Sequence, residues 1–99
     1  MYVSNIKSVR QEIEKGLGTI GRIRILAELV TKPNSSFTKY ALIKGTGLKR
    51  SDLKSNLAVL VSIKWVKEYK AAVYLRYQID VGNPIVQLLY DFFKRSEYI

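Results

Sequence analysis

The sequence of 99 residues carries 17 Lys and Arg against eight Asp and Glu, a net charge of +9, and it has no cysteine and no histidine. These counts exclude disulfide frameworks, zinc fingers and thiol catalysis, and they remove the usual general base near neutral pH. The length predicts one domain, residues 1–99, and no apolar run approaches the roughly 20 residues that cross a bilayer.

The N-terminal segment is predicted to form a helix over residues 4–15. Ser4 can cap its start, and Gly16 can end it in the left-handed conformation. Apolar residues recur there at spacings of three and four, which marks one face of a helix: Val3, Ile6, Val9, Ile13 and Leu17.

Residues 16–21, GLGTIG, fit the dinucleotide-binding pattern G-x-G-x-x-G. That fingerprint requires a preceding strand and an acidic residue about 20 positions further on. Here a helix precedes, and residues 33–43 contain no acid. We therefore expect no cofactor. Gly16 is expected to end a helix, Gly18 to form a hinge, and Gly21 to allow close packing.

The middle of the chain is predicted to form short helices separated by turns. A second helix is predicted from Thr19 to Thr31, ended by Pro33. Phe37 is expected to start a very short strand. Thr38 then caps a third helix that Gly45 closes.

Residues 51–63 are predicted to be helical, although the stretch LAVLVSIKWV also suits a buried strand. Two alternating runs follow, WVKEYK and VYLRYQID, which predict a hairpin over residues 65–79 with a loop near Ala71 and Ala72. Ala-Ala suits a two-residue turn poorly, so Lys70 and Val73 are further candidates for the loop. Asn83 as cap and Pro84 at the first helical position predict a last helix over 84–95. The fold class is α+β, mostly helical, in the order α-α-(β)-α-α-β-β-α.

Two short helices joined by a glycine turn and followed by a hairpin describe a winged helix-turn-helix. Residues 42–57, LIKGTGLKRSDLKSNL, resemble the helix-turn-helix of MarR-, ArsR- and PadR-type regulators. YQID at 77–80 resembles the motif that closes their wing, and the resemblance covers about residues 19–80. The matching positions are Leu42, the turn residues Gly47 and Leu48, the hydroxyl residue Ser51, and the inward positions Leu53 and Leu57. Ile43 replaces the usual Ala, and Lys64 stands where a Gly often ends the recognition helix.

Positive charge is concentrated in one segment. Between Lys32 and Arg76 the sequence has ten basic and two acidic residues, which accounts for +8 of the net charge. A block of this kind is typical of polyanion binding, although a solubilising surface is the alternative. We expect double-stranded DNA as the partner, with the recognition helix, about 49–63, in the major groove.

Individual roles follow from side-chain chemistry. Arg50 is expected to read guanine and Asn56 adenine, unless Asn56 is partly buried and hydrogen-bonded. Lysines and helix N-termini are expected to hold phosphates. The predicted DNA-binding residues are Thr38, Lys39, Lys49, Arg50, Ser51, Lys54, Ser55, Asn56, Lys67, Lys70 and Arg76. Tyr74 is a candidate for stacking on single-stranded bases, with packing as the alternative.

The terminal helices carry more apolar surface than one domain needs. Ile85, Leu88, Leu89 and Phe92 are expected to face inward. We expect residues 1–17 and 83–99 to form a two-fold homodimer around the core of residues 19–80, although the two helices could simply pack on each other. The predicted interface residues are Ile6, Val9, Ile13, Val86, Leu89, Tyr90 and Phe93.

The sequence thus predicts a cytoplasmic, chromosome-associated, dimeric and sequence-specific regulator of transcription, most simply a repressor. It resembles small archaeal winged-helix proteins. No catalytic residues, metal, cofactor or membrane partner is expected. The alternatives are an architectural chromatin protein that binds DNA without reading bases, and a winged-helix adaptor that binds protein.

Overall fold

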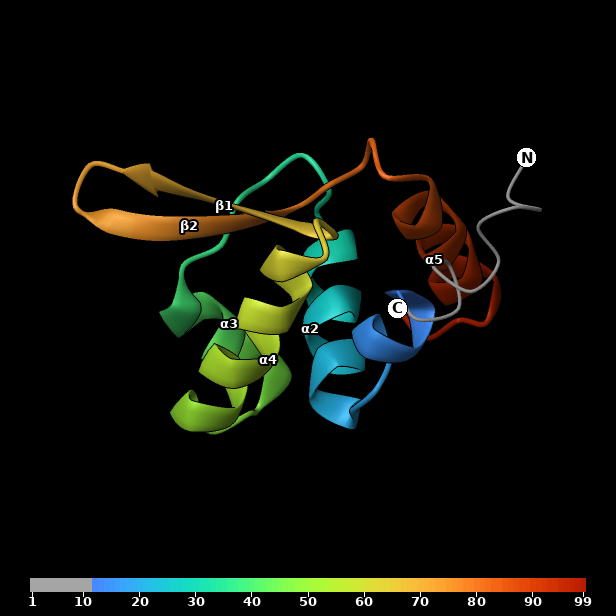
Figure 1. Ribbon diagram of the computed structural model, residues 1–99, viewed down its shortest axis with the longest axis horizontal. Helices are drawn as coiled ribbons and strands as arrows, with labels where there is room; N and C mark the ends of the chain where they lie inside the picture. The colour runs from blue at the N-terminus through green and yellow to red at the C-terminus, as the bar shows by residue number, and fades with distance from the viewer. Residues whose placement is uncertain (1–11) are drawn as a thin grey trace.

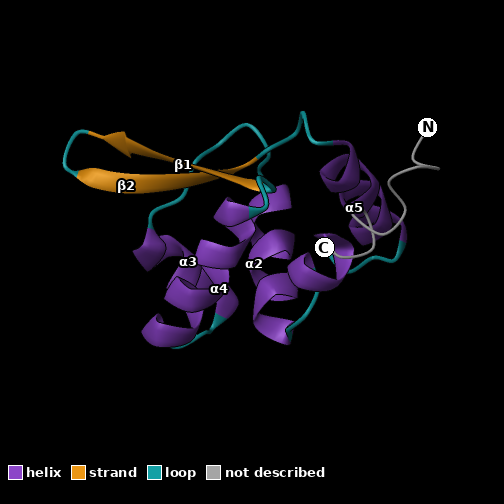
Figure 2. Ribbon diagram, in the orientation of Figure 1, coloured by secondary structure: helices purple, strands orange, loops and turns teal. Residues whose placement is uncertain are grey.

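The computed structural model describes residues 12–99, so the predicted start of the first helix, with Ile6 and Val9, lies outside the described residues. Residues 12–16 are helical and lead through a bend into α2 (Ile20–Val30). Next come α3 (Lys39–Thr46), α4 (Arg50–Ser62), the hairpin of β1 (Val66–Ala71) and β2 (Tyr74–Ile79), and α5 (Pro84–Arg95). Figures 1 and 2 show α2 at the centre, α3 and α4 on one side beneath the projecting hairpin, and α5 on the other side.

Three helices begin at the side-chain caps that their sequences indicate. Thr19 Oγ1 accepts from the backbone N–H of Arg22 at 3.1 Å, and Thr38 Oγ1 accepts from that of Ala41 at 3.2 Å. The carbonyl oxygen of the Asn83 side chain accepts from the first turn of α5 at 2.8 and 3.3 Å. These caps satisfy amide groups that a helix start otherwise leaves unpaired, which confirms the starts predicted at Thr38 and Asn83.

Two predictions about helix ends are corrected. Gly45 lies inside α3, and the left-handed residue that ends this helix is Gly47, at φ 73°. The first helical stretch does end at Gly16, within one residue of the prediction, but Gly16 is itself helical and has no positive φ. It lies against the indole ring of Trp65, and a Cβ at this position would clash with the ring. The glycine is therefore needed for close packing and not for ending the helix.

α4 is followed by a residue in the left-handed conformation, where glycine is usual. Lys64 has φ 66°, in the left-handed region. Its N–H donates to the carbonyl of Val61, and the N–H of Trp65 donates to that of Leu60, both at 3.1 Å. This pair of bonds is a Schellman motif, and the buried Leu60 and Trp65 side chains supply its apolar contact. The helical interpretation of residues 51–63 is confirmed.

The hairpin pairs in register from Val66 with Ile79 to Ala71 with Tyr74. The turn is therefore Ala72 and Val73, both among the residues considered for the loop, whereas Ala71 pairs as the last residue of β1. Ala72 takes φ 56°. Phe37 exchanges two backbone hydrogen bonds with Tyr77, of 2.7 and 2.8 Å, and so adds the predicted short strand to the edge of β2.

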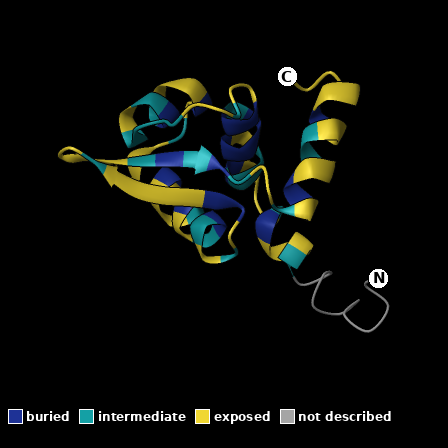
Figure 3. Ribbon diagram, turned by 90° about the horizontal axis from the view of Figure 1, so that it is seen from above, coloured by how far each residue is buried: buried dark blue, intermediate teal, exposed yellow. Residues whose placement is uncertain are grey.

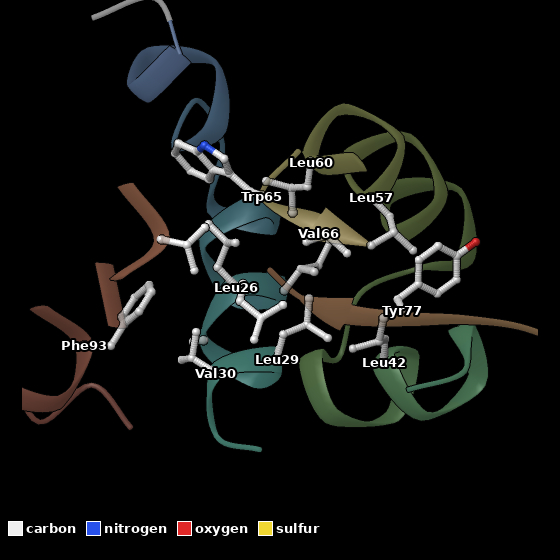
Figure 4. Packing of buried hydrophobic residues seen from close by; sticks show 14 of the residues in the cluster. Leu26, Leu29, Val30, Leu42, Leu57, Leu60, Trp65, Val66, Tyr77 and Phe93 are labelled. Carbon is white, nitrogen blue, oxygen red and sulfur yellow. The ribbon is translucent and has the colours of Figure 1, made fainter. Parts of the chain in front are cut away.

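The core lies between α2, α4 and the base of the hairpin. Its fully buried side chains come from every element, and Figure 4 shows them converging on α2. Leu53, Leu57 and Leu60 of α4 are buried, as their spacing predicts. Trp65, between α4 and β1, is buried and donates from Nε1 to Glu12 Oε2 at 2.5 Å, which holds the helical stretch 12–16 to the core.

The faces of α5 differ from the prediction. Ile85, Val86 and Phe93 are the buried residues of this helix, whereas Leu88 and Phe92, expected to face inward, are exposed. Figure 3 shows how much of α5 is exposed. The apolar side of this helix is wide, running from Leu88 and Phe92 to Val86, so the periodicity does not decide which part of that side meets α2. No helix in the described part of the chain combines the length and the apolarity needed to cross a membrane.

Candidate nucleic-acid interface

The outer face of α4 carries a cluster of basic and hydroxyl side chains. Because the three leucines of α4 point into the core, the residues between them point outward. Every member of this cluster is exposed: Lys49, Arg50, Ser51, Lys54 and Ser55. The structure thus brings five of the predicted DNA-binding residues together on the N-terminal half of one helix.

Asn56 is not free on this surface. Its Oδ1 accepts from the Thr19 hydroxyl and from Arg22 Nε, both at 3.0 Å, and its Nδ2 donates to the Asp52 carbonyl at 2.9 Å. A Cβ on Gly21 would come within 2.6 Å of Asn56 Nδ2, so the predicted close packing at Gly21 is confirmed. The structure favours the hydrogen-bonded role for Asn56 over the reading of adenine.

The start of α3 lies beside this cluster. The Thr38 hydroxyl is engaged as a helix cap. Lys39 is half-buried, and its Nζ lies 6.0 Å from the centre of the Tyr77 ring. Lys39, Arg50 and Lys54 line one hollow between α3 and α4 together with Tyr40, Ile43 and Leu53.

The three predicted DNA-binding residues of the hairpin differ in exposure and in hydrogen bonding. Lys67 and Lys70 are exposed on β1. Arg76 is half-buried, and its guanidinium donates to the Ser36 hydroxyl at 2.6 Å and to the Ser36 carbonyl at 3.1 Å. Arg76 therefore holds the turn before Phe37 against β2. The expectation that it reaches along the wing to DNA stays a prediction.

Tyr77 anchors the inner face of the hairpin. Its hydroxyl donates to Glu68 Oε2 at 2.7 Å, directly across the strand pair. Burial raises the pKa of the Tyr77 hydroxyl, and the hydrogen bond to Glu68 and its negative charge raise that pKa further. This contact engages one of the two carboxylates in the basic segment, and Glu68 keeps its negative charge there.

A second hollow, which the sequence did not indicate, lies between the start of α3 and the hairpin turn. It has a volume of about 610 Å³ and is lined by Thr38, Lys39, Tyr40, Val73, Tyr74 and Leu75. Tyr40 and Tyr74 are both exposed. Tyr40 could have been found from the sequence, because the inward position of Leu42 places Tyr40 on the opposite side of α3.

An apolar groove of about 450 Å³ lies on the far side of the molecule. It is lined by Ile13, Leu17, Ile23, Ile85, Leu88, Leu89, Phe92 and Phe93. The side chains of Leu88 and Phe92 are 68% and 61% exposed. Val86 and Phe93, predicted at a dimer interface, are buried within the chain. Among residues 12–99, no three His, Cys, Asp or Glu side chains are grouped to hold a metal ion.

Two helices crossing at a glycine turn, with a basic second helix and a two-stranded wing, define the winged helix-turn-helix fold. The comparisons with solved structures agree. The transcriptional repressor BigR from Xylella fastidiosa superposes with a TM-score of 0.75 at 17% identity, over 91% of this chain and 86% of that one. HlyU from Vibrio cholerae gives 0.74 at 22% identity, over 96% of both chains.

A third similar structure is a fragment from Mycobacterium bovis. It is described as the homodimeric winged helix-turn-helix DNA-binding domain of a possible ArsR-family transcriptional regulator. Its TM-score is 0.72 at 19% identity, over 97% of this chain and 84% of that one. The sequence itself matches no protein family model and no curated protein. The likeness establishes the fold, and the predicted winged helix-turn-helix is confirmed.

Proposed function

We propose that this protein is a dimeric, sequence-specific regulator of transcription that binds double-stranded DNA with α4 in the major groove. The observation that carries the proposal is the outer face of α4, where Arg50 and Lys54 stand exposed opposite the buried leucines. A recognition helix in this fold contacts base edges with its N-terminal residues. Arg50 is placed to read guanine, and Lys49 and Lys54 to hold phosphates.

The remaining basic residues extend this surface on both sides of α4. Lys39 at the start of α3 and Lys67 and Lys70 on the wing would contact the backbone that flanks the major groove. BigR is described as a transcriptional repressor, and the Mycobacterium bovis fragment as a DNA-binding domain. The same fold with basic residues on the outer face of α4 supports DNA binding and regulation of transcription here. The protein would act in the cytoplasm, on the chromosome, and would not be an enzyme.

A double variant tests the DNA-binding face. Arg50→Ala with Lys54→Ala is expected to weaken duplex binding by at least about tenfold and to reduce its salt dependence, because two cationic contacts are lost. Lys32→Ala with Lys94→Ala removes the same charge from exposed positions outside α4 and is the matched control. Unchanged duplex affinity in the variant of Arg50 and Lys54 would show that the DNA interface lies elsewhere on the molecule.

Selection from random duplexes tests sequence specificity. A regulator enriches a defined motif with half-sites about 34 Å apart, one turn of DNA, because two recognition helices meet the same face of the duplex. Equal binding to every duplex at fixed salt would favour the architectural alternative, and no duplex binding at all would favour the adaptor.

The proposed dimer rests on the apolar groove beside α5. Leu88 and Phe92 expose large apolar side chains there, which a second copy of the chain would cover. The Mycobacterium bovis fragment, which has the same fold, is described as homodimeric. Leu88→Glu with Phe92→Glu should give the mass of one chain in light scattering, whereas Gln87→Glu, exposed on the same helix, should leave two chains associated. A wild-type mass of one chain at high concentration would refute the dimer.

A further inference from the structure

Two tyrosines from separate elements border the hollow between α3 and the hairpin turn. Tyr40 is in the first turn of α3, and Tyr74 is the first residue of β2. Their side chains are 67% and 64% exposed. Aromatic rings ordinarily bury their large apolar area, as Tyr77 does in the same hairpin. Two open rings on one hollow therefore suggest a ligand that offers a flat surface.

The surroundings of this hollow are cationic. Lys39 lines it, and Lys44 Nζ lies 5.5 Å from the centre of the Tyr40 ring. The adjoining hollow shares Lys39 and Tyr40 and adds Arg50 and Lys54. None of the residues that line either hollow is acidic. A ligand that presents both a flat ring and negative charge fits this combination, and a nucleotide has both.

Duplex DNA does not offer the required ring. Within a duplex the faces of the bases are stacked on one another, and a protein in the grooves meets only base edges, sugars and phosphates. An unpaired base exposes its face and can stack on an aromatic side chain, which is worth about 1–3 kcal/mol per base. The exposed rings are therefore suited to a strand that is not paired.

We propose that this hollow binds unpaired bases of single-stranded nucleic acid, stacked on Tyr40 and Tyr74, with Lys39 and Lys44 beside the phosphates. This inference rests on the proposed function in one respect, that the basic face of α3 and α4 meets nucleic acid. It adds a second form of nucleic acid to that face. Because Lys39 belongs to both surfaces, duplex and single strand compete for the protein.

The experiment compares two strands that differ only in their bases. Fluorescence anisotropy measures binding of a thymidylate strand of about 12 nucleotides and of an abasic strand with the same number of phosphates. Stacking predicts that the wild-type protein prefers the thymidylate strand by about 5- to 150-fold for each stacked base. Tyr40→Leu with Tyr74→Leu removes that preference and leaves binding of the abasic strand unchanged, because every lysine is retained.

Four further variants test the inference. Tyr40→Phe keeps the ring and retains the preference. Tyr98→Leu changes an exposed tyrosine at the other end of the molecule and also retains it. The single changes Tyr40→Leu and Tyr74→Leu each reduce the preference. Both positions are exposed, so the fold is retained, and circular dichroism checks this. Equal binding of the two strands by the wild-type protein overturns the inference, as does a preference that persists in the double leucine variant.

The two proposals fail in different ways. Duplex binding that depends on Arg50 and Lys54, combined with no preference for bases in the single strand, overturns only the stacking site. A preference for the thymidylate strand without duplex binding overturns the regulator and supports the stacking site. A hollow that serves an apolar peptide instead gives no preference for bases, and this outcome also overturns the inference.

Discussion

Arg22 Nε lies 3.0 Å from Asn56 Oδ1, and this hydrogen bond joins α2 to α4. A second donor of the same guanidinium, Arg22 Nη1, reaches the backbone carbonyl of Lys15 at 2.5 Å. One arginine thus connects α4, α2 and the helical stretch 12–16. The orientation of the proposed recognition helix is therefore set partly by a side chain of α2.

The first prediction concerns Asn56. Asn56→Ala should lower the free energy of unfolding by about 1–2 kcal/mol, because Thr19 and Arg22 lose their shared acceptor. Duplex affinity should fall by a similar factor for every sequence. Urea unfolding and binding to a panel of duplexes measure these effects, with Ser62→Ala, exposed at the other end of α4, as control. Altered preference at one base pair with unchanged stability would instead establish Asn56 as a base-contacting residue.

The second prediction concerns the contact between Gly16 and Trp65. Gly16→Ala should place a methyl group against the indole and cost about 1–3 kcal/mol. The segment with Glu12 should separate from Trp65, and emission from this single tryptophan should shift to the red as the ring meets water. Gly82→Ala is the control, since the nearest atom, Asp80 Oδ1, is 3.4 Å away. Unchanged emission in the Gly16 variant would contradict the packing role.

The third prediction is a stabilising change. The backbone of Lys64 adopts φ 66°, a conformation that costs any residue other than glycine about 1–2 kcal/mol. Lys64→Gly relieves this strain but increases the freedom of the unfolded chain, so a net gain of about 1 kcal/mol is expected. Differential scanning calorimetry measures the change. Ser62→Gly, within the last turn of α4, should destabilise the protein by about the same amount. A loss of stability in the Lys64 variant would show that its side chain makes a contact worth more than the strain.

The fourth prediction concerns alkaline pH. The pKa of Tyr77 is raised in the folded protein above the value of about 10 of an unfolded chain. Its contribution to stability is therefore complete below pH ~10 and is lost as the pH rises above that value. Tyr77→Phe lacks this titration, so its unfolding free energy should fall less steeply with pH. Urea unfolding across an alkaline series compares the two proteins, and equal slopes would contradict the assignment.

The order of the elements and two of the helix starts follow from local signals in the sequence. Thr38 and Asn83 place these starts, because a side-chain oxygen before an apolar repeat caps a helix. The alternation in residues 65–79 predicts the hairpin. The buried leucines of α4 predict which side of that helix is exposed, and with it most of the proposed DNA-binding face.

Other features depend on tertiary contacts that no local pattern specifies. Phe93 is buried and Phe92 exposed because α5 meets α2 along one part of its wide apolar side. Asn56 is hydrogen-bonded because Arg22 lies across from it, and these residues are 34 positions apart in the chain. Gly16 is needed because of Trp65, which is still more remote in sequence. The hinge expected at Gly18 stays a prediction, and the hydrogen bond from Arg22 to Lys15 spans the same segment.

The start of α4 differs from the other helix starts in how it is capped. α2, α3 and α5 each have a capping side chain, whereas Lys49 at the start of α4 makes no such bond. The first-turn amide groups of α4 therefore have no side-chain acceptor, although the carboxylate of Asp52 in this turn complements the helix dipole. A phosphate group at this position would supply the missing acceptor. In the proposed binding mode the start of α4 is completed by the DNA itself, so binding of DNA should slow amide exchange first in this turn.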